Sequence, residues 1–229
     1  MRASEIAKLV NFKEELNPDL WQNNNLRREV EYKLLQIAKA FISFINLPDL
    51  KLEDITISGS NASFNYNDHS DIDLHLIVDM DTPCGKELKE LFQAKKSQFN
   101  DQHDILIRNH PVEVYVQDAK QSHISNGIYS VIKDSWLKQP NKITAKPDTT
   151  NVENKYIYLK NEIEQAISSG DEITITKLQA KIKQLRQAGL EAHGEFGAEN
   201  LAFKLLRNDG SIQNLYDAKK TAVDKKLSI

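Results

Sequence analysis

The ten residues from 70 to 79, SDIDLHLIVD, constrain the fold more than any other part of the chain. Apolar and polar residues alternate along this segment, and a period of two residues is that of a β-strand with one buried and one polar face. The segment therefore predicts a half-buried strand that presents two carboxylates to the same side. The apolar face consists of Ile72, Leu74, Leu76 and Val78, and the polar face of Asp71, Asp73 and His75.

The composition is that of a globular protein with a substantial core. The chain has 229 residues, of which 40% are hydrophobic and 28% are charged. This length allows one large domain, or one ordinary domain with a smaller companion. Lys and Arg number 30 against 33 Asp and Glu, which gives a net charge of -3. Such a balance provides no broad positive field, so we expect no strong binding to duplex DNA.

Cysteine content and hydropathy indicate a compartment. Cys84 is the one cysteine of the chain, so an internal disulfide is excluded and a reducing environment is favoured. Residues 1–12 lack the apolar core of a signal peptide, and no segment approaches the roughly 18 apolar residues of a membrane span. We expect a cytoplasmic protein with no membrane partner.

The fold class predicted for the chain is α/β (α+β): a small mixed β-sheet behind a long N-terminal helix, then a C-terminal helical bundle. The long helix rests on apolar residues spaced three and four apart from Leu26 to Ile45, after a start signal at Asn17-Pro18. Strands are predicted where apolar residues alternate, and helices where they recur at helical spacing. The expected elements of the first part are a helix over 19–46, strands over 55–58 and 70–79, a helix over 83–99, and a hairpin of strands 104–108 and 112–117 with its turn at 109–111.

The second part of the chain contains helical patterns and no strand signals. Residues 127–136 are ambiguous, and the polar residues 142–150 are typical of a linker. We expect a first domain over residues 1–148 and a helical domain over residues 149–229. The helices of the second domain are predicted over 152–168, 172–189, 195–207 and 212–226, with Gly170, Gly194 and Asp209-Gly210 between them.

The paired aspartates predict a cation site. Asp71 and Asp73 lie two residues apart on one strand face, so their Cα atoms are about 6.5 to 7 Å apart. Two ionised carboxylates this close repel each other unless a cation lies between them. Their hard oxygen donors favour Mg²⁺, or alternatively Mn²⁺, over zinc.

Two further motifs extend this site toward phosphate chemistry. Gly59-Ser60 follows the strand over 55–58, where a glycine allows close approach of a ligand, and a hydroxyl with free N–H groups attracts phosphate oxygens. Glu113 lies between two valines on a predicted strand, and it joins the cation site if that strand neighbours the first. Three acids, two metals and a phosphate-binding turn suit in-line attack on an α-phosphate.

These motifs resemble the signature of the DNA polymerase β-like nucleotidyltransferase superfamily. The resemblance covers about residues 55 to 117, and the whole chain is more faintly similar to bacteriophage proteins of this superfamily. It implies transfer of a nucleoside monophosphate from an NTP to a hydroxyl acceptor, with release of pyrophosphate and with Mg²⁺ bound. The matching motifs are Gly59-Ser60, Asp71-Ile72-Asp73-Leu74 and Val112-Glu113-Val114.

The resemblance also implies residue roles. Asp71 and Asp73 would bind both metals, and Glu113 would complete one metal site and assist deprotonation of the acceptor. Gly59 and Ser60 would hold the triphosphate. The acceptor stays open between an RNA 3′ end, a small molecule and a protein, because no acceptor-recognition motif is present.

Alternatives accompany each of these interpretations. A fold of this kind without catalysis, acting as a nucleotide-binding or partner-binding module, is the main alternative, and a glycosyltransferase using Asp-x-Asp for manganese is the third. His75 is expected to be a hydrogen-bonded histidine below the site, and His69 a solvated loop residue. Tyr129 and Trp136 are expected in the core, with stacking on a base as the alternative.

The helical domain offers the remaining candidates for nucleotide binding. A triphosphate needs cations nearby, and Lys204 and Arg207 at the end of one predicted helix are the residues we assign to that role. The alternative is an ordinary solvated helix face.

Overall fold

The computed structural model describes residues 12–47, 50–68, 70–81, 84–121, 125–142 and 146–229. These residues form two compact units, which we call the sheet unit (residues 12–142) and the helical unit (residues 146–229). The fold class is mixed α and β, as the sequence predicts. Within the described ranges, no helix has the length and apolar character needed to cross a membrane.

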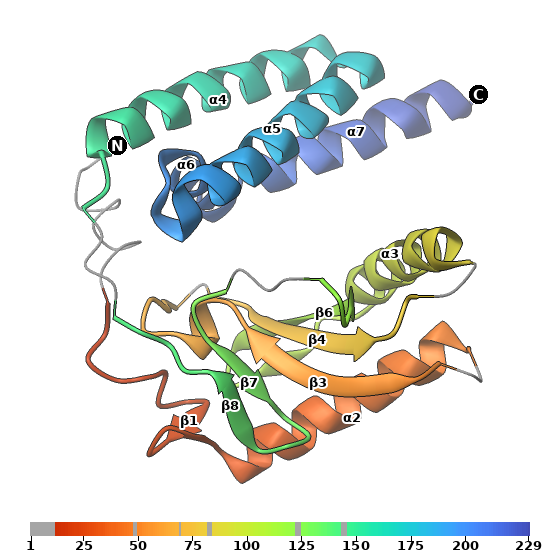
Figure 1. The fold of residues 1–229 in the computed structure, drawn as a ribbon. Helices are drawn as coiled ribbons and strands as arrows, with labels where there is room; N and C mark the ends of the chain where they lie inside the picture. The colour runs from red at the N-terminus through yellow and green to blue at the C-terminus, as the bar shows by residue number, and fades with distance from the viewer. Residues whose placement is uncertain (1–11, 48–49, 69, 82–83, 122–124, 143–145) are drawn as a thin grey trace. The chain divides into compact units, whose positions relative to one another are not determined.

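A sheet of six strands organises the sheet unit (Figure 1). The strands are β3 (Leu52–Ser58), β4 (Ile72–Val78), β5 (Leu106–Ile107), β6 (His110–Asp118), β7 (Ile128–Ser130) and β8 (Ser135–Lys138). Their order in the sheet is β5-β6-β4-β3-β7-β8, in which β4 and β6 pair in parallel and the other neighbours are antiparallel. The predicted strands at the centre of the sheet are thereby confirmed.

Two helices cover the apolar face of this sheet. The helices α2 (Arg28–Ile45) and α3 (Gly85–Gln102) contribute buried side chains to one core with the inward residues of β3, β4 and β6. Asn100 of α3 exchanges hydrogen bonds with the backbone of Val114, from its amide to the carbonyl at 3.3 Å and from the Val114 N–H to Oδ1 at 3.2 Å. The opposite face of β4 and β6 is therefore the face on which polar side chains gather.

The predicted start of the long helix at residue 19 is wrong. Residues Trp21–Gln22 (β1) and Asn25–Leu26 (β2) form a two-stranded hairpin instead, and α2 begins at Arg28. Asn23 and Asn24 both have positive φ angles, 52° and 63°, as a two-residue hairpin turn requires. Leu26 fits the helical spacing, but it belongs to β2 of the hairpin and is buried there.

Two other boundaries differ from the predictions. The turn of the β5–β6 hairpin lies at Arg108 and Asn109, with φ angles of 50° and 69°, so His110 belongs to β6 and not to the turn. The ambiguous residues 127–136 contain β7 and the start of β8. Both hairpins contribute buried residues to the core, Ile107 from β5–β6 and Tyr129 from β7–β8.

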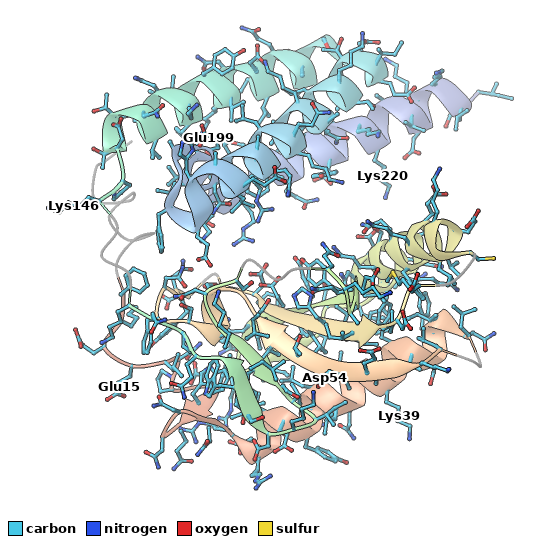
Figure 2. All side chains as sticks on the ribbon, viewed as in Figure 1. Glu15, Lys39, Asp54, Lys146, Glu199 and Lys220 are labelled. Carbon is cyan, nitrogen blue, oxygen red and sulfur yellow. The ribbon has the colours of Figure 1, made fainter. Side chains whose placement is uncertain are left out.

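The helical unit consists of four main helices, as the sequence predicts. The helices are α4 (Thr149–Ser169), α5 (Glu172–His193), α6 (Ala198–Asn208) and α7 (Ser211–Leu227), and a short 3₁₀ helix, η2 (Gly194–Phe196), lies between α5 and α6. Asp148 caps α4 by accepting a hydrogen bond from the Asn151 N–H at 3.0 Å, so the last residues of the predicted linker are helical. Charged side chains such as that of Lys220 project from the outer faces (Figure 2).

Candidate functional site

Strand register brings the three predicted acids together. In the parallel pair of β4 and β6, Asp73 lies opposite Glu113, and Asp71 directly precedes β4. One carboxylate oxygen from each of the three residues lies within 4.8 Å of the others. All three side chains are half-buried. The predicted convergence of Asp71, Asp73 and Glu113 is therefore present, and we call these residues the acidic triad.

Gly59 lies against the acidic triad for a steric reason. Its φ and ψ angles are 76° and -161°, a combination that is essentially restricted to glycine. A Cβ atom at this position would be 2.0 Å from Oδ2 of Asp73. Ser58 pairs with Asp73 across β3 and β4, so the chain turns sharply away from β3 directly beside the carboxylate. The absence of a side chain at Gly59 is what leaves room for the Asp73 carboxylate.

Ser60 follows Gly59 in a short 3₁₀ helix, η1 (Ser60–Ala62), and its hydroxyl has a partner within the protein. Ser60 Oγ donates a hydrogen bond to Ser70 Oγ at 2.9 Å, and Ser70 Oγ also accepts from the backbone N–H of Asn67 at 2.9 Å. Ser60 thus ties the Gly59 turn to the residue that precedes Asp71. Its role in holding a triphosphate stays a prediction.

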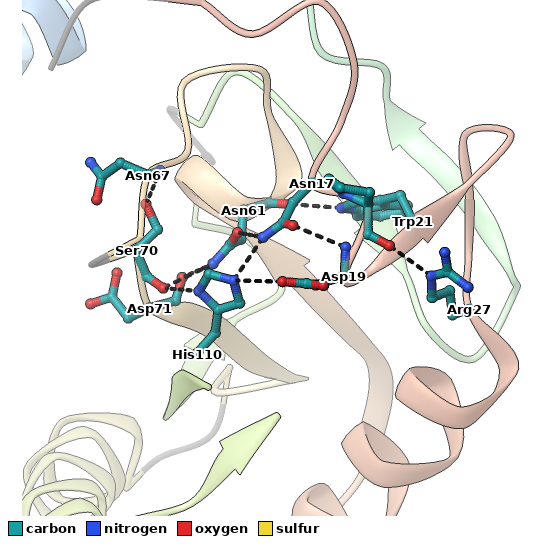
Figure 3. Close-up of polar contacts among 10 residues, drawn as sticks. Asn17, Asp19, Trp21, Arg27, Asn61, Asn67, Ser70, Asp71 and His110 are labelled. Atoms are coloured by element: carbon teal, nitrogen blue, oxygen red, sulfur yellow. Dashed lines mark hydrogen bonds and ion pairs between the residues drawn. The ribbon is translucent and has the colours of Figure 1, made fainter. Parts of the chain in front are cut away.

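A buried polar network supports the start of β4 (Figure 3). Asn61 Nδ2 donates to the carbonyl oxygens of Ser70 and Asp71, both at 3.0 Å. His110 Nδ1 lies 2.8 Å from the Ser70 carbonyl oxygen. Because Asn61, Ser70 and His110 are all buried, these hydrogen bonds are shielded from water and fix the backbone that carries Asp71.

The N-terminal hairpin completes the network from the other side. Asn17 Nδ2 donates to Asn61 Oδ1 at 2.8 Å and lies 2.9 Å from His110 Nε2. The Trp21 indole N–H donates to the Asn61 carbonyl oxygen at 2.7 Å (Figure 3). Since Asn17 uses its amide N–H groups as donors, His110 Nε2 accepts and Nδ1 carries the proton that it donates to Ser70. This tautomer of His110 satisfies both Asn17 and the Ser70 carbonyl oxygen, and Asp19 Oδ2 lies 3.9 Å from Nε2.

Two aromatic rings lie on the same face of the sheet, one row beyond the acids. His75 is paired with Thr56 on one side and Tyr115 on the other, and its Nε2 forms a hydrogen bond of 3.1 Å with Ser58 Oγ. The rings of His75 and Tyr115 are stacked, with centroids 5.0 Å apart and planes 17° apart. The prediction of His75 as a hydrogen-bonded residue below the site is confirmed.

Tyr115 also contacts the acidic triad directly. Its hydroxyl donates a hydrogen bond to Glu113 Oε2 at 2.5 Å. Burial raises the pKa of Tyr115 well above its usual value, and the charges of Asp73 and Glu113 raise the pKa further. The Lys96 ammonium lies 3.7 Å from the centroid of the Tyr115 ring. Tyr115 is therefore a neutral hydrogen-bond donor at every physiological pH.

The remaining predicted residues lie elsewhere. Tyr129 and Trp136 form an aromatic cluster with Trp21, with ring centroids 4.6 to 5.1 Å apart, which confirms that they belong to the core. Lys204 and Arg207 lie on α6 in the helical unit, so their assignment to nucleotide binding stays a prediction. His69 lies outside the described residues.

Four residues of the site were not found from the sequence: Asn17, Asn61, His110 and Tyr115. Asn17 lies 93 residues from His110 along the chain, and no local pattern connects them. Tyr115 had a usable signal, because it lies two residues after Glu113 on a predicted strand and therefore on the same face.

We predict that Gly59→Ala destabilises the protein more than Gly194→Ala. Gly194 has nearly the same backbone angles, 67° and -162°, but a Cβ there would meet no atom within 4 Å. Backbone strain of about 1 to 3 kcal/mol is common to both variants, whereas only Gly59→Ala also displaces Asp73. Urea unfolding, monitored by circular dichroism, measures the loss of unfolding free energy in each variant. Equal losses would show that the Asp73 contact is not the reason for glycine at position 59.

A second prediction concerns Asn61→Asp, which replaces the amide donor by an oxygen facing two carbonyl groups. We expect a loss of about 3 kcal/mol or more in unfolding free energy, because the new carboxylate is buried and its neighbours lose their donor. Asn214→Asp, an identical change on the exposed face of α7, is the control and should stay within about 0.5 kcal/mol. Chemical denaturation of both variants tests this, and a similar small effect at both positions would contradict the supporting role of Asn61.

Known proteins were compared with the chain in three ways. No protein-family model, no curated protein and no solved structure matches it. The site itself consists of three convergent carboxylates, a glycine turn beside them and a tyrosine hydroxyl bonded to one of them.

Proposed function

We propose that the protein is a Mg²⁺-dependent nucleotidyltransferase, which transfers a nucleoside monophosphate from an NTP to a hydroxyl acceptor and releases pyrophosphate. The observation that carries the proposal is the convergence of Asp71, Asp73 and Glu113 beside the Gly59 turn. Structural networks rarely hold three carboxylates this close, because their charges repel one another. In an active site for phosphate chemistry, such carboxylates bind the metal ions that the reaction needs.

The acidic triad fits a small divalent cation. With ligand distances of about 2.1 Å, the oxygens around Mg²⁺ lie about 3 to 4 Å apart. The three oxygens of the triad lie within 4.8 Å of one another, so small side-chain rotations bring them to such positions. All three donors are hard carboxylate oxygens, which suit Mg²⁺ or Mn²⁺. Asp71, Asp73 and Glu113 would hold the metal.

The reaction makes one bond to the α-phosphorus and breaks another. The acceptor oxygen attacks the α-phosphorus, the bond to the bridging oxygen of the β-phosphate breaks, and its electron pair leaves with pyrophosphate. When bound, Mg²⁺ lowers the pKa of the attacking hydroxyl and offsets charge on the phosphates. Glu113 assists removal of the acceptor proton. The Gly59-Ser60 turn, which lies beside the Asp73 carboxylate, receives the triphosphate.

The proposal extends to partners and location. The acceptor is a hydroxyl of an RNA 3′ end, a small molecule or a protein. A cytoplasmic location is supported by Cys84, which is exposed and free, since an unpaired thiol persists in a reducing compartment.

We predict that Asp71→Asn and Asp73→Asn abolish label transfer from α-labelled NTPs to candidate RNAs, proteins or small molecules in the presence of Mg²⁺. Loss of a metal ligand should lower the rate by about three orders of magnitude, or roughly 4 kcal/mol of transition-state stabilisation. Asp79→Asn, which changes an exposed carboxylate just beyond β4, is the control and should keep the wild-type rate.

Two outcomes would contradict the proposal. Equal label transfer by wild type and by both triad variants would remove these residues from the chemistry. Thermal stabilisation by NTP that requires Mg²⁺, without product from any acceptor, would instead favour the catalytically silent nucleotide-binding module.

A further inference from the structure

We propose that Tyr115 is a positioning residue for Glu113. The Tyr115 hydroxyl holds the Glu113 carboxylate in place for cation binding and is not itself a ligand. The inference rests on the proposed function, because it takes Glu113 to be a metal ligand. It adds to the acidic triad a hydrogen-bonding partner that orients the Glu113 carboxylate.

The contact arises from strand geometry. Glu113 and Tyr115 lie two residues apart on β6, so their side chains leave the same face of the sheet. The Tyr115 hydroxyl donates to Glu113 Oε2 at 2.5 Å, a short hydrogen bond between a neutral donor and a charged acceptor. This hydrogen bond restrains the orientation of the Glu113 carboxylate beside Asp73 and Asp71.

The ring of Tyr115 is held in place by its own neighbours. His75 stacks on it from the adjacent strand β4, and the Lys96 ammonium of α3 lies 3.7 Å from its centroid. The hydroxyl is therefore directed at Glu113 by contacts that do not involve the hydroxyl. A rigid donor can restrain a flexible acceptor, whereas a mobile donor would simply follow it.

Glu113 needs such a restraint more than the two aspartates do. Its side chain has one more rotatable bond than that of aspartate, and repulsion from Asp71 and Asp73 pushes it away from the triad when no cation is bound. A hydrogen bond from Tyr115 opposes this movement and spreads part of the charge. Partners of this kind, which orient a ligand without touching the metal, typically change metal affinity by about 10- to 100-fold.

The test is the affinity of the full-length protein for Mn²⁺, measured by electron paramagnetic resonance. Tyr115→Phe removes the hydroxyl and keeps the ring, and we expect Mn²⁺ binding about 10- to 100-fold weaker than in wild type. Tyr129→Phe is the matched control, because Tyr129 also donates to a carboxylate, Asp134, at 2.5 Å. Since Asp134 is not in the acidic triad, that variant should bind Mn²⁺ within twofold of wild type.

A second background separates positioning from a general structural effect. If Tyr115 acts through Glu113, Tyr115→Phe should change Mn²⁺ affinity less than twofold in a Glu113→Ala protein. A similar loss in both backgrounds would overturn the inference, as would wild-type affinity in Tyr115→Phe alone.

The same measurements distinguish this inference from the proposed function. If wild type does not bind Mn²⁺, or if Asp71→Asn binds it as tightly as wild type, both the inference and the proposed function are overturned. If Mn²⁺ binding follows the expected pattern but no acceptor receives label, the positioning role of Tyr115 stands and the nucleotidyl transfer does not.

Discussion

Electrostatic repulsion among Asp71, Asp73 and Glu113 is the constraint around which the sheet unit is built. Three carboxylates with oxygens within 4.8 Å cost free energy in the absence of a cation, so other interactions must hold them. The parallel pairing of β4 with β6 provides most of that restraint, because it places Asp73 opposite Glu113. This register is fixed in turn by the buried opposite face, since a slip of one residue would expose every apolar side chain of the strand.

The loop side of the site is restrained by different means. Hydrogen bonds from Asn61 and His110 hold the backbone at Ser70 and Asp71, where β4 has not yet begun and no sheet pairing is available. Asn17 connects this network to the N-terminal hairpin, because its backbone carbonyl oxygen accepts a hydrogen bond from the Trp21 N–H at 2.8 Å. A buried network is stable only when all its members are satisfied, so the hairpin at residues 21–26 is a part of the site even though it contributes no acid.

The sequence predicted the acids well and their support poorly, for a physical reason. Alternation shows which side chains share a strand face, so Asp71 and Asp73 followed directly. Two flanking valines placed Glu113 on a strand, but its neighbour was not predicted, and the parallel pairing with β4 comes from the structure. The network that holds them depends on contacts between residues up to 93 positions apart, which no local pattern records. The start of α2 was mispredicted because Leu26 fits a helical stripe, whereas the positive φ angles of two asparagines decide the turn.

The polar face of the sheet divides into rows with different tasks. Across β3, β4 and β6, the first row holds Ser58, Asp73 and Glu113, and the next holds Thr56, His75 and Tyr115. The stacked rings of the second row lie directly beside the acids, and the Tyr115 hydroxyl bonds to one of them. On the same face, one residue pair along each strand, the row of acids is followed by a row of rings that hydrogen-bond to the row of acids through Tyr115 and to Ser58 through His75. This arrangement follows from a strand pattern of Asp-x-His beside Glu-x-Tyr, because residues two apart share a face and the parallel register aligns the two strands.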